Sequence, residues 1–305
     1  MASAHPLSST SLFSLRGLVA VVTGGGTGVG LMITQTLAAN GAKVYITGRR
    51  ADVLETSARI HGSPERLGPL GGSIIPIVMD ITSKESIKSV VAEISQKEEF
   101  VNVLVNNAGI WGGRPAAKAE DGPEAFSEAI LAESKEDNWQ RSFDVNCTSQ
   151  YFVTAAFLPL LAKAESGPTG KIGSVINNSS IGGLLRMTQN CQFSYNASKA
   201  AFIQLTRQMA FEFSHERINV RVNGIVLGYF PSEMSTGESN DENVSTPQDE
   251  RFALFMKSLG AEKVKRMGTP QELASAILML VTNDFVWGTS IIVDGGVCLT
   301  VPGNI

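Results

Sequence analysis

The sequence predicts an α/β fold, a doubly wound parallel sheet of about seven strands with helices on both faces. Short apolar runs alternate along the chain with longer amphipathic stretches, and a glycine-rich turn follows the first run. Most of the runs are continuous, which is typical of strands buried on both faces. The alternation of strands with helices favours parallel order, because each parallel connection needs a crossover.

Seven apolar runs are predicted to be strands and five amphipathic stretches to be helices. The strands are expected at 18–23, 43–47, 74–79, 103–106, 173–177, 221–226 and 290–293. The helices are expected at 29–40, 84–98, 139–164, 195–214 and 270–281. No internal repeat or interdomain linker interrupts this order, which indicates a single domain at 15–305. Residues 1–14 lack the marks of a signal or transit peptide and are expected to form a flexible arm.

Two irregular stretches interrupt the alternation. Residues 112–135 are rich in Ala, Glu, Gly and Pro, and residues 229–268 are polar at first and then amphipathic. Solvated surface insertions are one interpretation of both. Long insertions in compact domains are often active-site covers, and the second stretch follows a strand end. Residues 229–268 are therefore predicted to form a substrate lid.

Composition and charge argue against several classes of protein. The net charge of −4 and the lack of a large Lys/Arg cluster argue against nucleic acid as a main partner. No apolar run approaches the roughly 18 residues of a membrane span. The three cysteines and three histidines show no metal-ligand spacing, and the odd cysteine count argues against a disulfide framework. We therefore expect no metal, no membrane partner and a reducing, cytoplasmic location.

The glycine-rich turn at 23–30 predicts a dinucleotide site of the Rossmann type. Between a strand and a helix, glycines let the backbone approach a pyrophosphate, and the helix N-terminus attracts its charge. A flexible turn without a ligand is the alternative, but a second strand follows, as the motif requires. The cofactor contacts expected in this turn are Gly24, Thr27, Gly28, Val29 and Gly30.

The end of the second predicted strand indicates which cofactor binds. An NAD site usually offers a carboxylate to the ribose hydroxyls here, whereas this strand ends in Arg49 and Arg50. Two guanidinium groups suit a 2′-phosphate, so NADP(H) is predicted over NAD(H). Alternatively, both arginines begin a solvated helix. Asp80, at the end of the third strand, could accept a hydrogen bond from adenine or cap the next helix.

Tyr195 and Lys199 are the clearest candidates for proton transfer. Their spacing places them on one face of a helix, with the ammonium beside the phenol. A nearby positive charge favours the phenolate and should lower the pKa of the phenol. The spacing alone is a weak signal, and its weight depends on the motifs that precede it.

Six motifs, in this order, resemble those of the short-chain dehydrogenase/reductase family over nearly the whole chain. They are Thr23-Gly24-x-x-x-Gly28-x-Gly30, Asn106-Asn107-Ala108-Gly109, Asn146, Ser180-x-x-Gly183, Tyr195-x-x-x-Lys199 and Val293-Asp294-Gly295-Gly296. The residues after the sixth strand most resemble reductases of the 3-oxoacyl-reductase type. Leu227 departs from the family pattern, which often has Pro there, and residues 187–193 are expected to bulge over the substrate.

The resemblance implies a catalytic group of Asn146, Ser180, Tyr195 and Lys199. Tyr195 would donate a proton, and Lys199 would lower the phenol pKa and hold the nicotinamide ribose. Ser180 would stabilise charge on the carbonyl oxygen, and Asn146 would hold a water that relays protons. Ser179 with Gly182 also fits the serine motif, and Asn146 could instead be a buried asparagine bonded to backbone.

The resemblance also implies further cofactor contacts and an activity. Asn107, Ala108, Gly109 and Gly228 are expected to join Tyr195 and Lys199 at the cofactor. The predicted function is an NADP(H)-dependent carbonyl reductase for a ketone or secondary alcohol, with 3-oxoacyl groups and ketones of secondary metabolism as candidate substrates. The alternatives are an alcohol dehydrogenase acting mainly in oxidation and a cofactor-binding protein with a cyclase, dehydratase or scaffold role. A homodimer or homotetramer is expected, and no motif indicates the substrate or the physiological direction.

Overall fold

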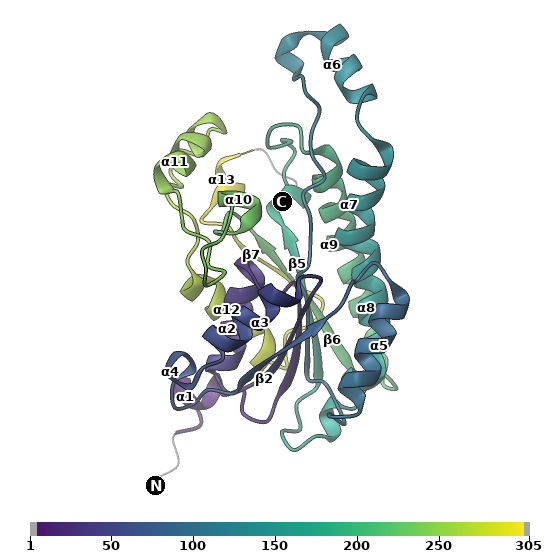
Figure 1. Ribbon diagram of the computed structural model, residues 1–305, viewed down its shortest axis with the longest axis vertical. Coiled ribbons are helices and arrows are strands. Elements are labelled where there is room, and N and C mark those ends of the chain that lie inside the picture. Colours follow the sequence, from purple (N-terminus) through teal and green to yellow (C-terminus); the bar gives the residue numbers. More distant parts are fainter. Residues whose placement is uncertain (1–4, 302–305) are drawn as a thin grey trace.

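A seven-stranded parallel sheet forms the centre of the computed structural model, which describes residues 5–301 (Figure 1). The strands are β1 (Val19–Thr23), β2 (Lys43–Gly48), β3 (Ser73–Val78), β4 (Val103–Asn106), β5 (Gly173–Ser180), β6 (Val220–Leu227) and β7 (Ser290–Val293). Their order is β3-β2-β1-β4-β5-β6-β7, and every pairing is parallel. The chain starts at the middle of the sheet and winds outward in both directions, which confirms the predicted fold class.

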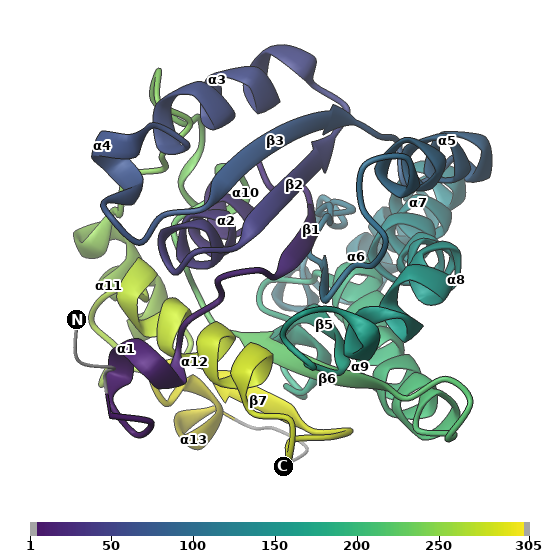
Figure 2. The ribbon, with the colours of Figure 1, turned by 90° about the horizontal axis from the view of Figure 1, so that it is seen from below.

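Two layers of helices cover the sheet, one on each face (Figure 2). The first layer holds α2 (Gly28–Ala39), α3 (Ala51–His61) and α12 (Pro270–Thr282). The second holds α5 (Lys84–Ser95), α8 (Ser149–Ala162) and α9 (Phe193–Phe213). Parallel strands need these crossovers, and right-handed crossovers on either side of the starting strand place helices on both faces.

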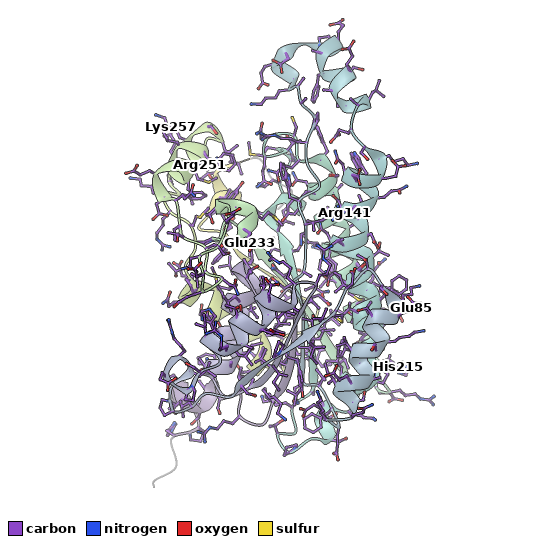
Figure 3. All side chains as sticks on the ribbon, in the orientation of Figure 1. Glu85, Arg141, His215, Glu233, Arg251 and Lys257 are labelled. Atoms are coloured by element: carbon purple, nitrogen blue, oxygen red, sulfur yellow. The ribbon has the colours of Figure 1, made fainter. Side chains whose placement is uncertain are left out.

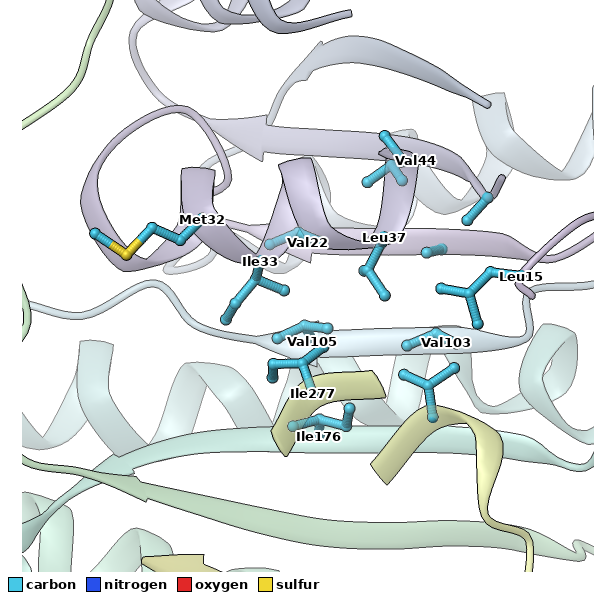
Figure 4. Close-up of a cluster of buried hydrophobic side chains, with 14 of the residues drawn as sticks. Leu15, Val22, Met32, Ile33, Leu37, Val44, Val103, Val105, Ile176 and Ile277 are labelled. Atoms are coloured by element: carbon cyan, nitrogen blue, oxygen red, sulfur yellow. The ribbon is translucent and has the colours of Figure 1, made fainter. Parts of the chain in front are cut away.

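Each layer buries its own hydrophobic cluster against the sheet. Figure 4 shows the cluster beneath α2, where Ile33 and Leu37 pack on Val22 of β1. Val21, which points to the opposite face, belongs to the second cluster with Phe157 of α8. The continuous apolar run of β1 is explained by this two-sided burial, since neighbouring residues of a strand face opposite sides.

The N-terminal residues precede the sheet as a short extension. Residues 1–4 of the expected arm lie outside the described residues. Within the described part, α1 (Ser9–Leu12) is a single helical turn with no buried residue. Leu15, where we expect the domain to begin, is fully buried in the cluster beneath α2.

The single helix predicted at 139–164 is wrong in its start and its regularity. The structure has two π-helical segments there, η2 (Lys135–Gln140) and η3 (Asp144–Thr148), separated by α7 (Arg141–Phe143) and followed by α8. A π-helical turn holds one more residue than an α-helical turn, so it shifts the side chains that face the sheet. Two helices beside β2 and β3 were not among the five predicted: the one-turn α4 (Pro64–Leu67), and α3, which appeared only as the solvated helix in the alternative interpretation of Arg49 and Arg50. Because α3 begins at Ala51, Arg50 is its N-cap residue.

Both irregular stretches contain helices of their own. Residues 112–135 form η1 (Ala119–Asp121) and α6 (Pro123–Leu131), which project beyond the sheet at the top of Figure 1. Residues 229–268 form α10 (Glu233–Thr236) and α11 (Asp249–Ser258). Two short 3-10 turns, η4 (Ala164–Ser166) and η5 (Ile181–Gly183), flank β5. The last helix is α13 (Val297–Thr300).

The segment at 229–268 is packed onto the domain. Phe252 and Met256 of α11 are buried in a third hydrophobic cluster with Ile203 of α9 and Val297 of α13. A purely solvated insertion would leave these side chains exposed. Helix α11 is therefore held in place by its apolar face while its polar face stays in water.

Candidate functional site

The carboxyl ends of the strands open into one cavity of about 930 Å³. Open parallel sheets bind ligands at this edge, close to the point where the strand order reverses, here between β1 and β4. All but one of the predicted site residues line the cavity. They are Gly24, Thr27, Gly28, Val29, Gly30, Arg49, Arg50, Asp80, Asn107, Ala108, Gly109, Ser180, Tyr195, Lys199 and Gly228. Asn146 is the exception and is fully buried behind the wall.

The glycine-rich turn has no room for a side chain at Gly30. A Cβ atom on Gly30 would lie 1.9 Å from the carbonyl oxygen of Gly24. Gly28 has a φ of +51°, in the left-handed region that glycine adopts readily. Asn107 pins the turn from β4, because its Nδ2 donates to the carbonyl oxygen of Thr23 at 2.9 Å. The start of α2 is thereby held open toward the cavity.

Arg49 and Arg50, which are predicted to bind the 2′-phosphate of the cofactor, each lie near a carboxylate. Arg50 donates to both carboxylate oxygens of Glu233 in α10, at 2.9 and 3.4 Å. The pKa of Asp80 is lowered, mainly by the backbone N–H of Thr82 and to a lesser degree by the charge of Arg49. Asp80 does not cap the next helix, since the Oγ of Ser83 accepts that bond from Ser86. Of the two interpretations of Asp80, the structure rules out the helix cap.

Ser180 and Tyr195 meet at the opposite end of the cavity. Ser180 ends β5, and its hydroxyl lies within hydrogen-bonding contact of the Tyr195 phenol. Burial raises the pKa of Tyr195, and the bond with Ser180 opposes that rise. The neighbouring Ser179 points away from the phenol, because its Oγ donates to the backbone carbonyl of Lys199 at 3.1 Å. The structure thus brings Ser180, and not Ser179, to the phenol.

Lys199 lies about one helical turn after Tyr195, on the same face of α9. Its Nζ is 5.9 Å from the centre of the Tyr195 ring and donates to the carbonyl oxygen of Asn178 at 3.1 Å. Burial lowers the pKa of Lys199 to about 8. The expected lowering of the phenol pKa by Lys199 is not found: burial raises the pKa of Tyr195, and the bond with Ser180 is what opposes that rise.

Asn146 supports the cavity from behind. Its Oδ1 accepts from the backbone N–H of Ile110 at 2.8 Å, and its Nδ2 donates to the carbonyl oxygen of Ile110 at 3.0 Å. A Cβ on Gly109 would lie 3.2 Å from Asn146 Oδ1 and 3.6 Å from Lys199 Nζ. Asn146 is therefore both a backbone-bonded buried asparagine and a close neighbour of Lys199.

The substrate end of the cavity contains residues that the sequence motifs did not single out. Gln189 is buried, and its Nε2 donates to the hydroxyl of Tyr229 at 2.7 Å. Gln189, Asn190 and Cys191 have φ angles of 52°, 75° and 63°, a run that non-glycine residues rarely adopt. The segment bulges toward the cavity, where Gln189 and Gln192 line the wall. The bulge expected at 187–193 is thus present, and its signal in the sequence was the spacing of 15 residues from Ser180 to Tyr195.

Two features are absent from the described residues, 5–301: a helix able to cross a membrane and a cluster of metal ligands. No helix within them combines the length and the apolar character needed to cross a bilayer. No group of three or more His, Cys, Asp or Glu side chains among them is arranged to hold a metal ion. The residues that line the cavity include a phenol, a hydroxyl and a buried amine, from Tyr195, Ser180 and Lys199.

Comparisons with known proteins agree with the fold and the motifs. A family model described as short chain dehydrogenase matches residues 18–243. The chain is 35% identical over 308 residues to short-chain dehydrogenase/reductase PhomF of Diaporthe leptostromiformis, covering 98% of this chain and 97% of that protein. It is 32% identical over 288 residues to the rhamnolipids biosynthesis 3-oxoacyl-[acyl-carrier-protein] reductase of Pseudomonas aeruginosa, covering 93% and 97%. The solved Pseudomonas aeruginosa RhlG/NADP active-site complex is similar with a TM-score of 0.69 at 28% identity, over 94% of this chain and 98% of that chain.

Proposed function

This chain belongs to the short-chain dehydrogenase family of oxidoreductases, and from that premise we propose that it is an NADP(H)-dependent carbonyl reductase. The observation that carries the proposal is the convergence of Ser180, Tyr195 and Lys199 at one end of a cavity whose other end holds Arg49 and Arg50. Its substrate is a ketone, or the corresponding secondary alcohol in the reverse direction.

The cavity fits a dinucleotide on structural grounds. The turn at Gly24–Gly30 leaves room for a pyrophosphate where any side chain on Gly30 would clash with backbone. The Oγ1 of Thr47 and the Oδ1 of Asn178 are buried without a partner among the described residues, and both residues line the cavity. Buried polar atoms of this kind are usually satisfied, so a bound ligand would supply the missing partners. Arg49 and Arg50 favour the phosphorylated form of the cofactor.

Tyr195, Ser180 and Lys199 have different roles in the transfer of one proton to the carbonyl oxygen. A bound nicotinamide would supply hydride to the carbonyl carbon, which no side chain can do. Tyr195 donates its proton to the carbonyl oxygen, and its raised pKa keeps it protonated at neutral pH. Ser180 donates a hydrogen bond to the same oxygen and stabilises its developing charge. Lys199 stabilises the phenolate that remains.

Asn146 completes this arrangement as a positioning residue. It fixes the backbone of Ile110 beside Gly109 and lies next to Lys199. Asn146 is the buried residue of the π-helical segment η3, a kind of turn that is frequent at functional sites. A water held there would return a proton to Tyr195 through Lys199. In alcohol oxidation the same groups act in reverse, with Tyr195 as the base.

The test measures NADPH absorbance with a panel of ketones, 3-oxoacyl thioesters and quinones, and compares NADPH with NADH. We expect turnover with NADPH and a clear preference for it over NADH. Tyr195→Phe should reduce turnover by about a thousandfold while leaving NADPH affinity nearly unchanged. Tyr151→Phe, on the exposed face of α8, is the matched control and should retain activity. Faster turnover with NADH than with NADPH, or an active Tyr195→Phe variant, would refute the proposal.

A further inference from the structure

Glu233 lies where the cofactor phosphate is expected. Its carboxylate accepts hydrogen bonds from both terminal nitrogens of Arg50, at 2.9 and 3.4 Å. Glu233 and Asp80 are the two carboxylates among the residues that line the cofactor cavity. Figure 3 labels Glu233, the first residue of α10, together with Arg251 and Arg141. This pairing occupies the end of the guanidinium formed by its two terminal nitrogens, so a phosphate that binds Arg50 at this end must displace the carboxylate.

The same short segment also contacts the pyrophosphate turn. A Cβ on Gly28 would lie 2.8 Å from the Cβ of Ser232 and 3.2 Å from its Cα. Ser232 caps α10, and Glu233 is the first residue of that helix. The first turn of α10 therefore contacts both regions of the cavity that are expected to bind phosphate, the glycine-rich turn and Arg50.

We propose that Glu233 competes with the 2′-phosphate of NADP(H) for Arg50, so that lid contact and cofactor phosphate are alternative partners of one guanidinium. The proposal rests on the proposed NADP(H) function. Phosphate binding then releases the lid from Arg50, and the ion pair in turn weakens phosphate binding by the same factor. Glu233 is on this account a specificity-determining residue, which reduces the advantage of NADP(H) over NAD(H).

Calorimetry with 2′,5′-ADP and 5′-AMP measures how much the 2′-phosphate contributes to binding, separately from any catalytic step. Wild-type protein should bind 2′,5′-ADP more tightly than 5′-AMP. Glu233→Gln should tighten 2′,5′-ADP about two- to fivefold, the range of an exposed ion pair, and leave 5′-AMP unchanged. In an Arg50→Gln background the Glu233→Gln change should have no effect on either ligand.

The chain offers a matched control for this experiment. Glu242, in the same lid segment, pairs with Arg66 at 2.9 Å with similar exposure, but neither residue lines the cofactor cavity. Glu242→Gln should leave both affinities unchanged. If Glu233→Gln binds 2′,5′-ADP no more tightly than wild type does, while wild type still prefers 2′,5′-ADP to 5′-AMP, the proposed competition is wrong and the NADP(H) preference stands. Equal wild-type affinities for the two nucleotides overturn the NADP(H) preference and the competition with it.

A separate observation concerns the opposite, substrate end of the cavity. Three arginines from three elements line it: Arg114 after β4, Arg141 in α7 and Arg251 in α11. Among the described residues none of the three is ion-paired, and the side chain of Arg251 has only a 3.4 Å bond to Gln248. Both carboxylates of the lining are beside Arg49 and Arg50, so this end carries positive charge alone.

From this charge distribution we infer that the substrate carries an anionic group remote from its carbonyl, such as a carboxylate. The inference rests on the proposed reductase function. All three arginines are exposed residues at the cavity, and a neutral substrate would gain no charge-assisted hydrogen bond from them. An anionic group would accept charge-assisted, often bidentate hydrogen bonds, which are stronger than neutral ones. The arginines would therefore orient the substrate with its carbonyl toward Tyr195.

Matched pairs of oxo acids and their methyl esters test this inference. We expect kcat/KM about tenfold higher for the acid, and a several-fold smaller preference in Arg141→Gln and Arg251→Gln. Arg217→Gln, an exposed arginine outside the cavity, should keep the full preference. Equal or better turnover of the esters overturns the inference. Failure to oxidise NADPH with any pair overturns the reductase function itself.

Discussion

Asn146 and Ile110 exchange a reciprocal pair of hydrogen bonds, side-chain amide to backbone amide, at 2.8 and 3.0 Å. This pair joins the π-helical segment before α8 to the loop that leaves β4. A third bond, from Asn146 Nδ2 to Ser198 Oγ at 3.0 Å, ties both to α9. The floor of the substrate end is thus fixed by one side chain that does not itself line the cavity.

Asn146→Ala is expected to lower both stability and turnover. It removes the side-chain partner of the N–H and the carbonyl of the half-buried Ile110, which costs about 2 kcal/mol in the free energy of unfolding. Asn146→Asp keeps the acceptor for the Ile110 N–H but loses the donors. If Asn146 positions the proton path, Asn146→Asp shifts the pH profile of kcat; a purely structural role would change stability alone. Urea denaturation and pH–rate profiles separate the two.

The neighbouring serines at the end of β5 are expected to behave differently. Ser180→Ala removes the hydroxyl beside Tyr195 and should reduce kcat by roughly a hundredfold, as for other donors to a developing oxyanion. Ser179→Ala removes a bond to the Lys199 carbonyl and should cost about 1 kcal/mol of stability with little loss of turnover. A larger kinetic effect at Ser179 would contradict the assignment.

Lys199 should make stability depend on pH in a definite direction. Its folded pKa is about 8, below the roughly 10.4 of an unfolded lysine. Between these values the unfolded state binds more protons, so stability rises with pH through this window. Lys199→Met should therefore be more stable than wild type at pH 7, by roughly 1–3 kcal/mol, with the difference shrinking toward pH 10.

The matched control for that prediction is Lys257→Met, an exposed lysine of α11 (Figure 3). It should leave the pH dependence of unfolding as in wild type. Lys199→Met should also lose most of its turnover, since the group that stabilises the phenolate is gone. A variant no more stable than wild type at pH 7 would show that Lys199 is not penalised by burial.

Arg221 is expected to be important for stability without affecting the chemistry. It is fully buried and donates to the carbonyl oxygens of Leu280 and Val281, both at 3.0 Å, and to that of Val286 at 3.3 Å. Arg221→Met should lower the free energy of unfolding by about 2–4 kcal/mol, because it removes the guanidinium donors to Leu280 and Val281, whereas Val286 keeps its bond from Asn223. Asp284→Asn, which alters its partly exposed ion-pair partner, should cost less than about 1 kcal/mol. Chemical denaturation of both variants checks the contrast.

The sheet and the cofactor end were predictable from sequence because their signals are local. Continuous apolar runs mark strands buried on two faces, and a glycine turn has few backbone solutions. The same reasoning did not place α3 among the predicted helices, since its start at Ala51 follows two arginines with no conventional capping residue. It also described 139–164 as one regular helix, because inserting a π-helical turn leaves the overall apolar content unchanged.

The substrate end was less predictable because it is built from contacts between distant segments. Gln189 reaches the cavity only through a left-handed run of residues, and Tyr229 is positioned by its bond to Gln189. The pairing of Arg50 with Glu233 joins residues 183 positions apart, which no local pattern encodes. The roles assigned to the catalytic residues stay predictions until the variants above are measured.

The packing of α11 has a consequence for engineering the end of the chain. Phe252 and Met256 share their hydrophobic cluster with Val297 and Val301, near the C-terminal end of the described residues. A truncation or fusion that disturbs Val297 or Val301 would loosen the back of α11, and with it Arg251 at the cavity mouth. An affinity tag placed at the C-terminus is therefore expected to alter substrate preference, whereas α1, which has no buried residue, lies away from α10 and α11 in Figure 1.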